Sequence, residues 1–132
     1  MRFEIRTSRR EDLVDVTRKV AEAVKASGVT DGVVVVSSPH TTAGITVNEN
    51  ADPDVATDVI AGLAHTYPRD AGWRRFEGNS DAHLKTALVG VSVTLPVRGG
   101  RPDLGTWQAV YFAEFDGPRT RHFDVTVMPG EC

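Results

Sequence analysis

The last third of the chain limits the fold most strongly, because strand patterns follow one another there without a helix between them. After Gly90, apolar residues alternate with mainly polar ones over residues 91–97 and again over residues 123–127. Between these segments, residues 106–115 are largely apolar at both parities, which predicts a central strand. Consecutive strands of this kind pair antiparallel. The pattern therefore predicts an α+β fold with a mostly antiparallel sheet system rather than a doubly wound fold.

The N-terminal part predicts a short strand and a long helix. Phe3 and Ile5 alternate with polar neighbours, as in an edge strand. Ser8 and Glu11 have the spacing of a capping box, and apolar residues continue at helical spacing as far as Val24. We therefore expect a helix over residues 9–27 whose apolar face packs on a sheet.

Two further helices are expected in the middle of the chain. Asp52 followed by Pro53 is typical of a helix start and predicts an amphipathic helix that ends before Pro68. Ser80 fits the N-cap of a short third helix that Gly90 ends. The inward residues of this third helix are expected to be Leu84, Ala87 and Leu88.

Strands are also expected before the second helix. The four valines at 33–36 are too short and too β-branched a run for a helix, so they predict a strand buried on both faces. From 42 to 47 the residues alternate, which places Ile45 and Val47 on one side of a strand and Thr46 and Asn48 on the other.

Composition and size exclude several classes of protein. The chain has 132 residues, of which 40% are hydrophobic and 25% are charged, which fits a single domain over 1–132. A net charge of −3 gives no long-range attraction to nucleic acid or to an anionic membrane, so neither is expected as a partner. The sole cysteine is Cys132, and no stretch approaches the roughly 18 apolar residues of a membrane span. A cytoplasmic location is expected.

Chemically capable side chains are concentrated in three blocks beside apolar runs. The blocks are SPHTTAGITVNENADPD at 38–54, EGNSDAHLK at 77–85 and GTWQAVYFAEFDGPR at 105–119. Folds present reactive groups at the ends of strands and at helix starts. The blocks therefore predict a binding or catalytic site.

In this order and at these separations, the three blocks resemble the YjbQ family, also called UPF0047 and labelled secondary thiamine-phosphate synthase. The resemblance extends from about Ser8 to Val127. It implies a trimer with a β-sandwich-like core and flanking helices, two longer and one short. It also implies a weak or secondary thiamine-phosphate synthase activity, which joins a pyrimidine-methyl pyrophosphate to a thiazole phosphate.

His40, Glu49 and His83 are the candidate catalytic residues and the candidate ligands of a divalent metal, zinc or magnesium. The histidines match the HTT-type and AHLK-type motifs of the family, and a neutral imidazole serves as metal ligand, general base or phosphate donor. Glu49 enters the same site only if the chain leaves its strand at Asn48. We expect the three side chains to converge on one cleft. The alternative is two hydrogen-bonded structural histidines and a solvated carboxylate.

A small phosphorylated substrate is the expected ligand. Ser80 begins a helix whose free N–H groups favour an anion, and Lys85 is near on the same helix. Arg119 would clamp a phosphate or simply pair with Asp116. The candidate substrate-binding residues are Asn48, Ser80, Lys85, Gln108 and Arg119.

Three functions stay open on these residues: the weak synthase, a metal-dependent hydrolase of unknown substrate, and a non-catalytic trimer that binds a small molecule or metal. A serine nucleophile is disfavoured because the sequence has no GxSxG elbow.

Overall fold

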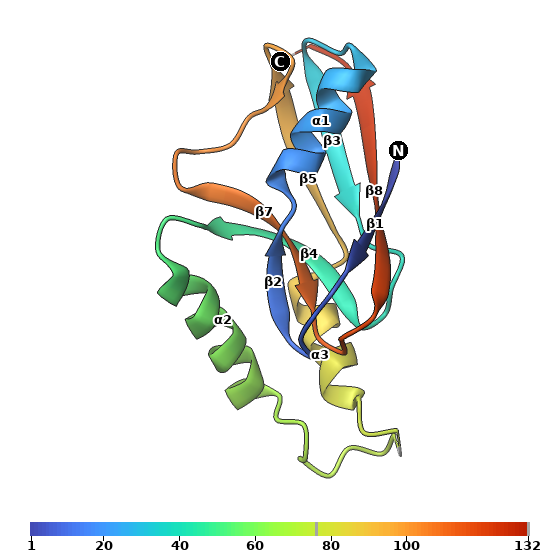
Figure 1. The fold of residues 1–132 in the computed structure, drawn as a ribbon, viewed down its shortest axis with the longest axis vertical. Coiled ribbons are helices and arrows are strands. Elements are labelled where there is room, and N and C mark those ends of the chain that lie inside the picture. Colours follow the sequence, from blue (N-terminus) through green and yellow to red (C-terminus); the bar gives the residue numbers. More distant parts are fainter. Residues whose placement is uncertain (76, 132) are drawn as a thin grey trace.

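The computed structural model describes residues 1–75 and 77–131, and over these residues the chain forms two antiparallel sheets and three helices (Figure 1). Cys132 lies outside the described residues. The elements are, in order, β1 (Arg2–Arg6), β2 (Asp12–Asp15), α1 (Thr17–Ser27), β3 (Gly32–Ser37), β4 (Ala43–Glu49), α2 (Pro53–Thr66), α3 (Ser80–Val89), β5 (Ser92–Arg98), β6 (Arg101–Pro102), β7 (Gln108–Glu114) and β8 (Thr120–Pro129).

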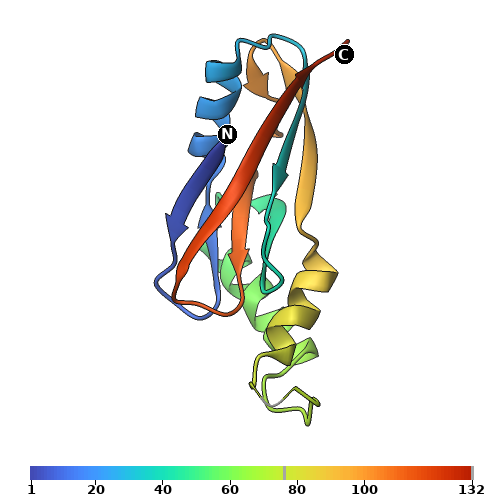
Figure 2. The ribbon, with the colours of Figure 1, turned by 90° about the vertical axis from the view of Figure 1, so that its right-hand side faces the viewer.

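The larger sheet has the order β1-β8-β3-β5-β6, and the smaller sheet has the order β2-β7-β4. All strand pairs in both sheets are antiparallel. Figure 2 shows the strands of both sheets running along the long axis, with α3 at one end. The α+β prediction is confirmed, and so is the central position of β7 and the edge position of β1.

The core lies between the two sheets and under α1. Phe112 of the smaller sheet and Phe123 of the larger sheet are both fully buried, and their ring centroids are 6.2 Å apart. Alternate residues of β3, Val34 and Val36, are buried in the same cluster, whereas Val33 and Val35 are partly exposed. The prediction of a strand buried on both faces is therefore wrong for β3, because one of its faces is only partly covered.

The first helix is shorter than predicted. Residues 12–15 form β2, which pairs with β7, and α1 begins at Thr17. The expected capping box does not form, since the Glu11 carboxylate lies 3.1 Å from Arg10 and 3.3 Å from Lys85. Pairing with β7 satisfies the backbone groups of this segment, and that long-range gain outweighs its local helical spacing.

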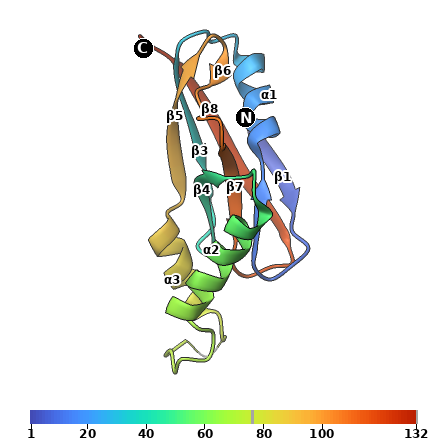
Figure 3. The ribbon, with the colours of Figure 1, turned by 90° about the vertical axis from the view of Figure 1, so that its left-hand side faces the viewer.

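The α2 helix begins as predicted but packs loosely. The Asp52 side chain accepts a hydrogen bond from the Asp54 amide at 2.9 Å, and Pro53 is the first helical residue. None of the α2 residues is fully buried, although Leu63 packs against the cluster of Ala82, Ala113 and Phe115, and Figure 3 shows α2 in the lower half of the molecule, as α3 is. Its apolar side is only partly covered by its own chain, since Val59, Ile60 and Leu63 are half-buried. No helix in the described residues is long and apolar enough to cross a membrane.

The buried side of α3 differs from the prediction. Leu88 is 60% exposed and Ala87 is also exposed, so neither is directed inward. The buried residues of this helix are Asp81, Ala82, Lys85 and Thr86. The predicted end at Gly90 is confirmed, since its amide donates to the carbonyl of Thr86 at 2.8 Å.

Candidate functional site

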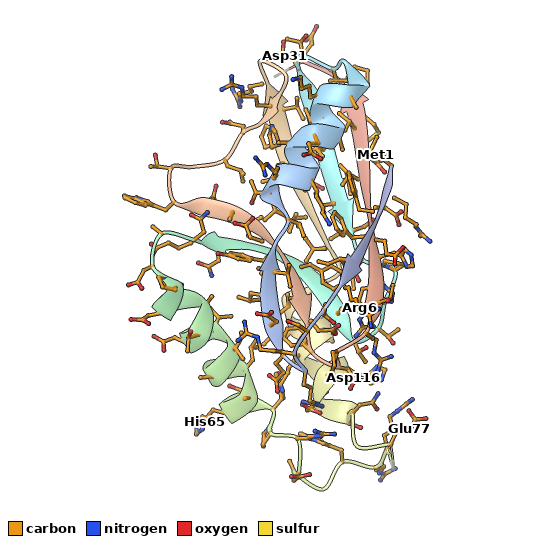
Figure 4. All side chains as sticks on the ribbon, viewed as in Figure 1. Met1, Arg6, Asp31, His65, Glu77 and Asp116 are labelled. Atoms are coloured by element: carbon orange, nitrogen blue, oxygen red, sulfur yellow. The ribbon has the colours of Figure 1, made fainter. Side chains whose placement is uncertain are left out.

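A polar pocket of about 410 Å³ lies where α3 meets the β3–β4 connection and the turn between β7 and β8. Its lining includes three arginines and two histidines, which come from three segments far apart in sequence. Figure 4 places Asp116 and Glu77 at this end of the molecule. The lining residues are Pro39, His40, Thr41, Thr42, Arg75, Glu77, Asn79, His83, Asp116, Arg119 and Arg121.

The β3–β4 connection places His40 through the Ser38 hydroxyl. This hydroxyl donates to the Ala43 carbonyl at 2.7 Å and accepts from the His40 amide at 3.2 Å. Ser38 is buried, so its contacts stay dry. The loop is thereby closed on itself just before β4, and the imidazole projects from a fixed backbone.

The β7–β8 turn is held by the segment between β1 and β2. The Gly117 amide donates to the Arg10 carbonyl at 3.0 Å, and the Thr7 hydroxyl accepts from the Arg119 amide at 3.0 Å. A Cβ atom on Gly117 would lie 2.3 Å from the carbonyl oxygen of Arg9. Only glycine permits this close approach, so Gly117 sets how closely the turn that carries Asp116 and Arg119 packs against the segment between β1 and β2.

Arg121 and Glu114 form a buried ion pair behind the pocket. The Arg121 side chain is 3% exposed and that of Glu114 is 0% exposed, and Nε of Arg121 donates to Oε1 of Glu114 at 2.9 Å. Nη2 also donates to the Thr42 hydroxyl at 2.9 Å. Nη1 has no hydrogen-bond partner among the described residues. Burial raises the pKa of the Glu114 carboxyl, but hydrogen bonds from Arg121 and Thr7 outweigh burial and lower it.

Arg119 lies at the opposite wall and is paired with Asp116, which was one of its two expected roles. Its Nε donates to the Asp116 carbonyl at 2.8 Å, and its Nη2 donates to the Asp116 carboxylate at 3.1 Å. The same carboxylate oxygen accepts from the Asn79 amide group at 3.1 Å. Asp116 thus joins the turn to the start of α3, while Nη1 of Arg119 keeps no partner within the described part of the chain.

His83 separates this pocket from a second one. The second pocket has a volume of about 390 Å³ and is lined by Trp73, Arg74, Arg75, Ser80, His83 and Leu84. Nε2 of His83 is buried and has no hydrogen-bond partner among the described atoms. An imidazole nitrogen in this state has the capacity for one more hydrogen bond, for which an ordered water is a common partner.

His40 is held in a neutral form. Its Nε2 accepts a hydrogen bond from the His122 amide at 3.0 Å, and its ring packs edge-on against Phe112. Burial lowers the pKa of His40, and the positive charge of Arg121 lowers it further.

Lys85, an expected substrate ligand, does not line either pocket. Its ammonium group is 1% exposed and contacts Asp81 at 2.7 Å and Glu11 at 3.3 Å. Arg10 donates two hydrogen bonds to the same Asp81, at 3.0 and 3.1 Å. Lys85 therefore helps to bind α3 to the β1–β2 connection, and the prediction that it contacts substrate is not supported.

Glu49, Asn48 and Gln108 lie at the far end of the smaller sheet. Glu49 is the last residue of β4 and pairs with Gln108. Since β4 begins at Ala43, six residues at about 3.3 Å each separate its ends by about 20 Å. The Asn48 side chain accepts from its neighbour's amide at 2.7 Å, and that of Gln108 accepts from the Gly105 amide at 2.8 Å.

The expected metal triad is not assembled within one chain. His40 and His83 line the same pocket, but Glu49 does not line it. No group of three histidine, cysteine or acidic side chains among residues 1–75 and 77–131 is placed to hold a metal ion. The donor set that the described residues of one chain bring together therefore does not fit a resident zinc or magnesium ion.

Arg121 and Arg75 line the pocket but were not predicted from the sequence. A signal for Arg121 was present. It has the same parity as Phe123 and Val125, which are buried core residues of β8. A charged residue at the inward parity of a strand predicts a buried ion pair.

The fold and pocket define a small two-sheet α+β protein with a polar pocket at one end that contains arginine and histidine side chains. The sequence model of the YjbQ family, described as UPF0047 protein YjbQ-like, matches residues 1–130, and the chain belongs to this family. UPF0047 protein MJ1081 of Methanocaldococcus jannaschii is 51% identical over 127 residues, which cover 96% of this chain and 92% of the relative. UPF0047 protein YugU of Bacillus subtilis is 46% identical over 127 residues, with 96% of each chain covered.

Solved structures of relatives have the same fold. A YjbQ/UPF0047 family protein from Clostridium acetobutylicum is 46% identical with a TM-score of 0.95, over 97% of this chain and 99% of that chain. A conserved hypothetical protein from Thermus thermophilus is also 46% identical, with a TM-score of 0.90 over the same shares of the two chains.

Proposed function

We propose that the polar pocket binds the phosphate groups of a small phosphorylated substrate. Arg121 carries this proposal, because it is a buried guanidinium that lines the pocket and whose Nη1 has no partner in the described chain. Such an N–H group is a strong donor to a phosphate oxygen. Arg119 supplies a second donor of the same kind from the opposite wall.

The reaction that we propose for this site is a weak or secondary thiamine-phosphate synthase activity. The ring nitrogen of a thiazole phosphate attacks the methylene carbon of a pyrimidine-methyl pyrophosphate. The C–N bond forms as the C–O bond breaks, and pyrophosphate leaves with the bonding electron pair. Arg119 and Arg121 stabilise the charge that develops on the leaving oxygen. The sequence resemblance supports this reaction over others that use a phosphate site.

The two adjoining pockets favour a reaction between two ligands. They have volumes of about 410 and 390 Å³ and share the side chains of Arg75 and His83. The first is lined by polar residues, whereas the second has the indole of Trp73 and the side chain of Leu84 in its wall. A phosphate group suits the first and a flat ring suits the second.

A divalent ion, zinc or magnesium, enters the proposal only through an assembly. His40 and His83 lie on one pocket, so a neighbouring subunit would have to supply Glu49 or another third ligand. The metal-dependent hydrolase, which is the other enzymatic candidate, needs that ligand as well. No step of the reaction above uses a metal.

A homotrimer in the cytoplasm is part of the same proposal. The α2 helix buries none of its residues, and Trp107, next to the Glu49 end of the smaller sheet, is 62% exposed. Both features suit contacts between copies of the chain. A trimer that binds the same ligands without reaction is the non-catalytic alternative. Nucleic acid and membranes are not proposed as partners.

The test is an assay of thiamine phosphate and pyrophosphate with both substrates present. We expect the two products in equal amounts, a rate at least about tenfold lower for Arg121→Gln and Arg119→Gln, and no change for Arg98→Gln. Arg98 is a matched control because it pairs with Asp103 in an exposed ion pair outside the pocket. Pyrophosphate binding without product would leave the non-catalytic trimer, and absence of both would remove the proposal.

A further inference from the structure

The hydrogen bond between the His122 amide and His40 fixes where the His40 ring carries its proton. The amide nitrogen lies 3.0 Å from Nε2 of His40. A backbone amide only donates, so Nε2 must present its lone pair. A neutral imidazole has a single N–H group, and in His40 that group is therefore at Nδ1.

The surroundings of His40 keep the ring in this neutral form. Its protonation would put an N–H group against the N–H group of His122, and the bond would be lost. The charged and titratable groups that act on the ring are Arg121, Glu114 and the side chain of His122. Of these, Arg121 opposes a second positive charge, and burial acts in the same direction. The edge-on contact with Phe112, at 6.3 Å between centroids, holds the ring plane.

The Nδ1 atom is free to contact a ligand. His40 lines the pocket, and its Nδ1 has no hydrogen-bond partner among the described residues. The backbone amide of His40 already donates to the Ser38 hydroxyl, so this amide is not available to the same ligand atom. Nη1 of Arg119 and Nη1 of Arg121 are further donors on this pocket that have no partner among the described residues.

We propose that His40 serves the site as a neutral hydrogen-bond donor through Nδ1 to an oxygen of the bound anion, and not as a general base or as a metal ligand through Nε2. Donation from an uncharged ring adds a third directed contact without adding a third charge. The role as an anion donor rests on the proposed phosphate site, whereas the position of the proton does not. His83, whose buried Nε2 has no partner, is then the histidine with a nitrogen left for proton transfer.

The position of the proton is read directly by long-range ¹H–¹⁵N correlation on protein with ¹⁵N-labelled histidine, with the His40 signals assigned by their loss in His40→Gln. At neutral pH we expect a pyridine-like ¹⁵N shift at Nε2 and a pyrrole-like shift at Nδ1. The opposite pattern, or protonation of both nitrogens, overturns the inference whether or not the protein binds phosphate.

Two isosteric variants test the donor role. The side-chain amide of Asn lies near the position of Nδ1, and that of Gln lies near Nε2. His40→Asn keeps the donor toward the pocket and loses the acceptor for His122, while His40→Gln does the reverse. In calorimetric titration with pyrophosphate we expect His40→Asn to stay within about threefold of the wild type, and His40→Gln to weaken binding by about tenfold or more.

If His40 acts only by accepting the hydrogen bond from His122, His40→Gln should bind pyrophosphate more tightly than His40→Asn. That order of affinities, or equal affinities for the two variants, overturns the donor role. If the wild type itself does not bind pyrophosphate, the donor role fails together with the proposed function. The ¹⁵N measurement, which needs no ligand, then still decides the position of the proton.

Discussion

Asn79 and Arg119 meet on one carboxylate oxygen of Asp116, the first at 3.1 Å and the second also at 3.1 Å. This contact connects the start of α3 to the β7–β8 turn, two walls of the pocket that are 37 positions apart in sequence. Arg119 is half exposed, with 50% of its side chain accessible, so it is held in place without being sealed from ligand. A ligand therefore meets a preset guanidinium rather than a freely moving one.

Replacement of Arg119 by alanine should weaken phosphate-ester binding while the fold stays intact. The expected loss is about 1.5 to 3 kcal/mol, the usual value of a charge-assisted hydrogen bond. Calorimetric titration of wild type and Arg119→Ala with pyrophosphate and a thiazole phosphate measures it. Arg2→Ala, which removes an exposed ion pair with Asp124, is the control. Equal affinity of Arg119→Ala and wild type would contradict a phosphate site at this wall.

Arg121→Met should destabilise the protein strongly. It leaves the Glu114 carboxylate, which is 0% exposed, without its charged partner. Breaking a buried pair in this way costs about 3 to 5 kcal/mol, against about 0 to 1 kcal/mol for the exposed Arg2 pair in Arg2→Ala. Urea unfolding monitored by circular dichroism gives both values. Similar losses of stability in the two variants would contradict a buried ion pair between Arg121 and Glu114.

The stability of the protein should fall in acid because of Asp81 and Glu114. Burial raises the pKa of each carboxyl, but hydrogen bonds from Arg10 and Lys85 to Asp81, and from Arg121 to Glu114, outweigh burial, so both lie below their ordinary values of 3.8 and 4.5. The unfolded chain therefore binds more protons than the folded chain as the pH falls. The stabilising contribution of the two carboxylates is complete at pH values above their ordinary pKa values. It is lost as the pH falls through their pKa values in the folded protein.

Unfolding curves between about pH 6 and pH 3 measure this effect. Asp81→Asn should lower stability at pH 6 and flatten its dependence on pH. Asp58→Asn, on the exposed side of α2, should leave the slope as in the wild type. An Asp81→Asn protein with the wild-type slope would exclude Asp81 as a source of the acid sensitivity.

Gly117→Ala should distort the turn that carries Asp116 and Arg119. The added Cβ would lie 2.3 Å from the Arg9 carbonyl oxygen and 2.8 Å from the Thr7 hydroxyl. Overpacking of this kind costs about 1 to 3 kcal/mol. Gly62→Ala is the matched control, because nothing lies within 4 Å of its Cβ and alanine favours a helix interior by roughly 1 kcal/mol. Thermal unfolding should therefore shift in opposite directions for the two variants.

The protein should sediment as a trimer at micromolar concentration, and Trp107→Glu should shift it toward smaller species. Trp107 is 62% exposed in the isolated chain, and a carboxylate at a buried subunit contact costs several kcal/mol. Sedimentation velocity compares the wild type with Trp107→Glu. Leu88→Glu, which changes an exposed leucine on α3, is measured for comparison. A stable wild-type monomer would refute the assembly.

Local signals predicted the elements that local chemistry controls. The helix start at Asp52 and Pro53 needs only neighbouring residues, and it is present as predicted. The alternation of Phe123 and Val125 placed β8 correctly for the same reason. The helical spacing of Leu13 and Val16 predicted a helix over residues 9–27, and this prediction is wrong for residues 12–15, which pair with the edge of β7.

The structure brings together only some of the candidate site residues. The motifs selected His40, His83 and Arg119, and the structure places all three on one pocket. They also selected Glu49, which lies at the end of β4 away from the pocket. A sequence motif does not show in which direction a strand runs, so this separation was not predictable from the motif. Lys85 was assigned to a ligand on its charge, yet its partner Asp81 is four residues away on a helix side that packs inward.

The sequence by itself determined the family, the antiparallel α+β class and the residue types available for chemistry, since these depend on periodicity and on motifs within short segments. The tertiary structure decided which charges are used for folding and which are left for a ligand. Arg10 meets Asp81 across 71 positions, and His122 meets His40 across 82. Desolvation and hydrogen bonding set the state of these groups, and both depend on which distant segments cover them.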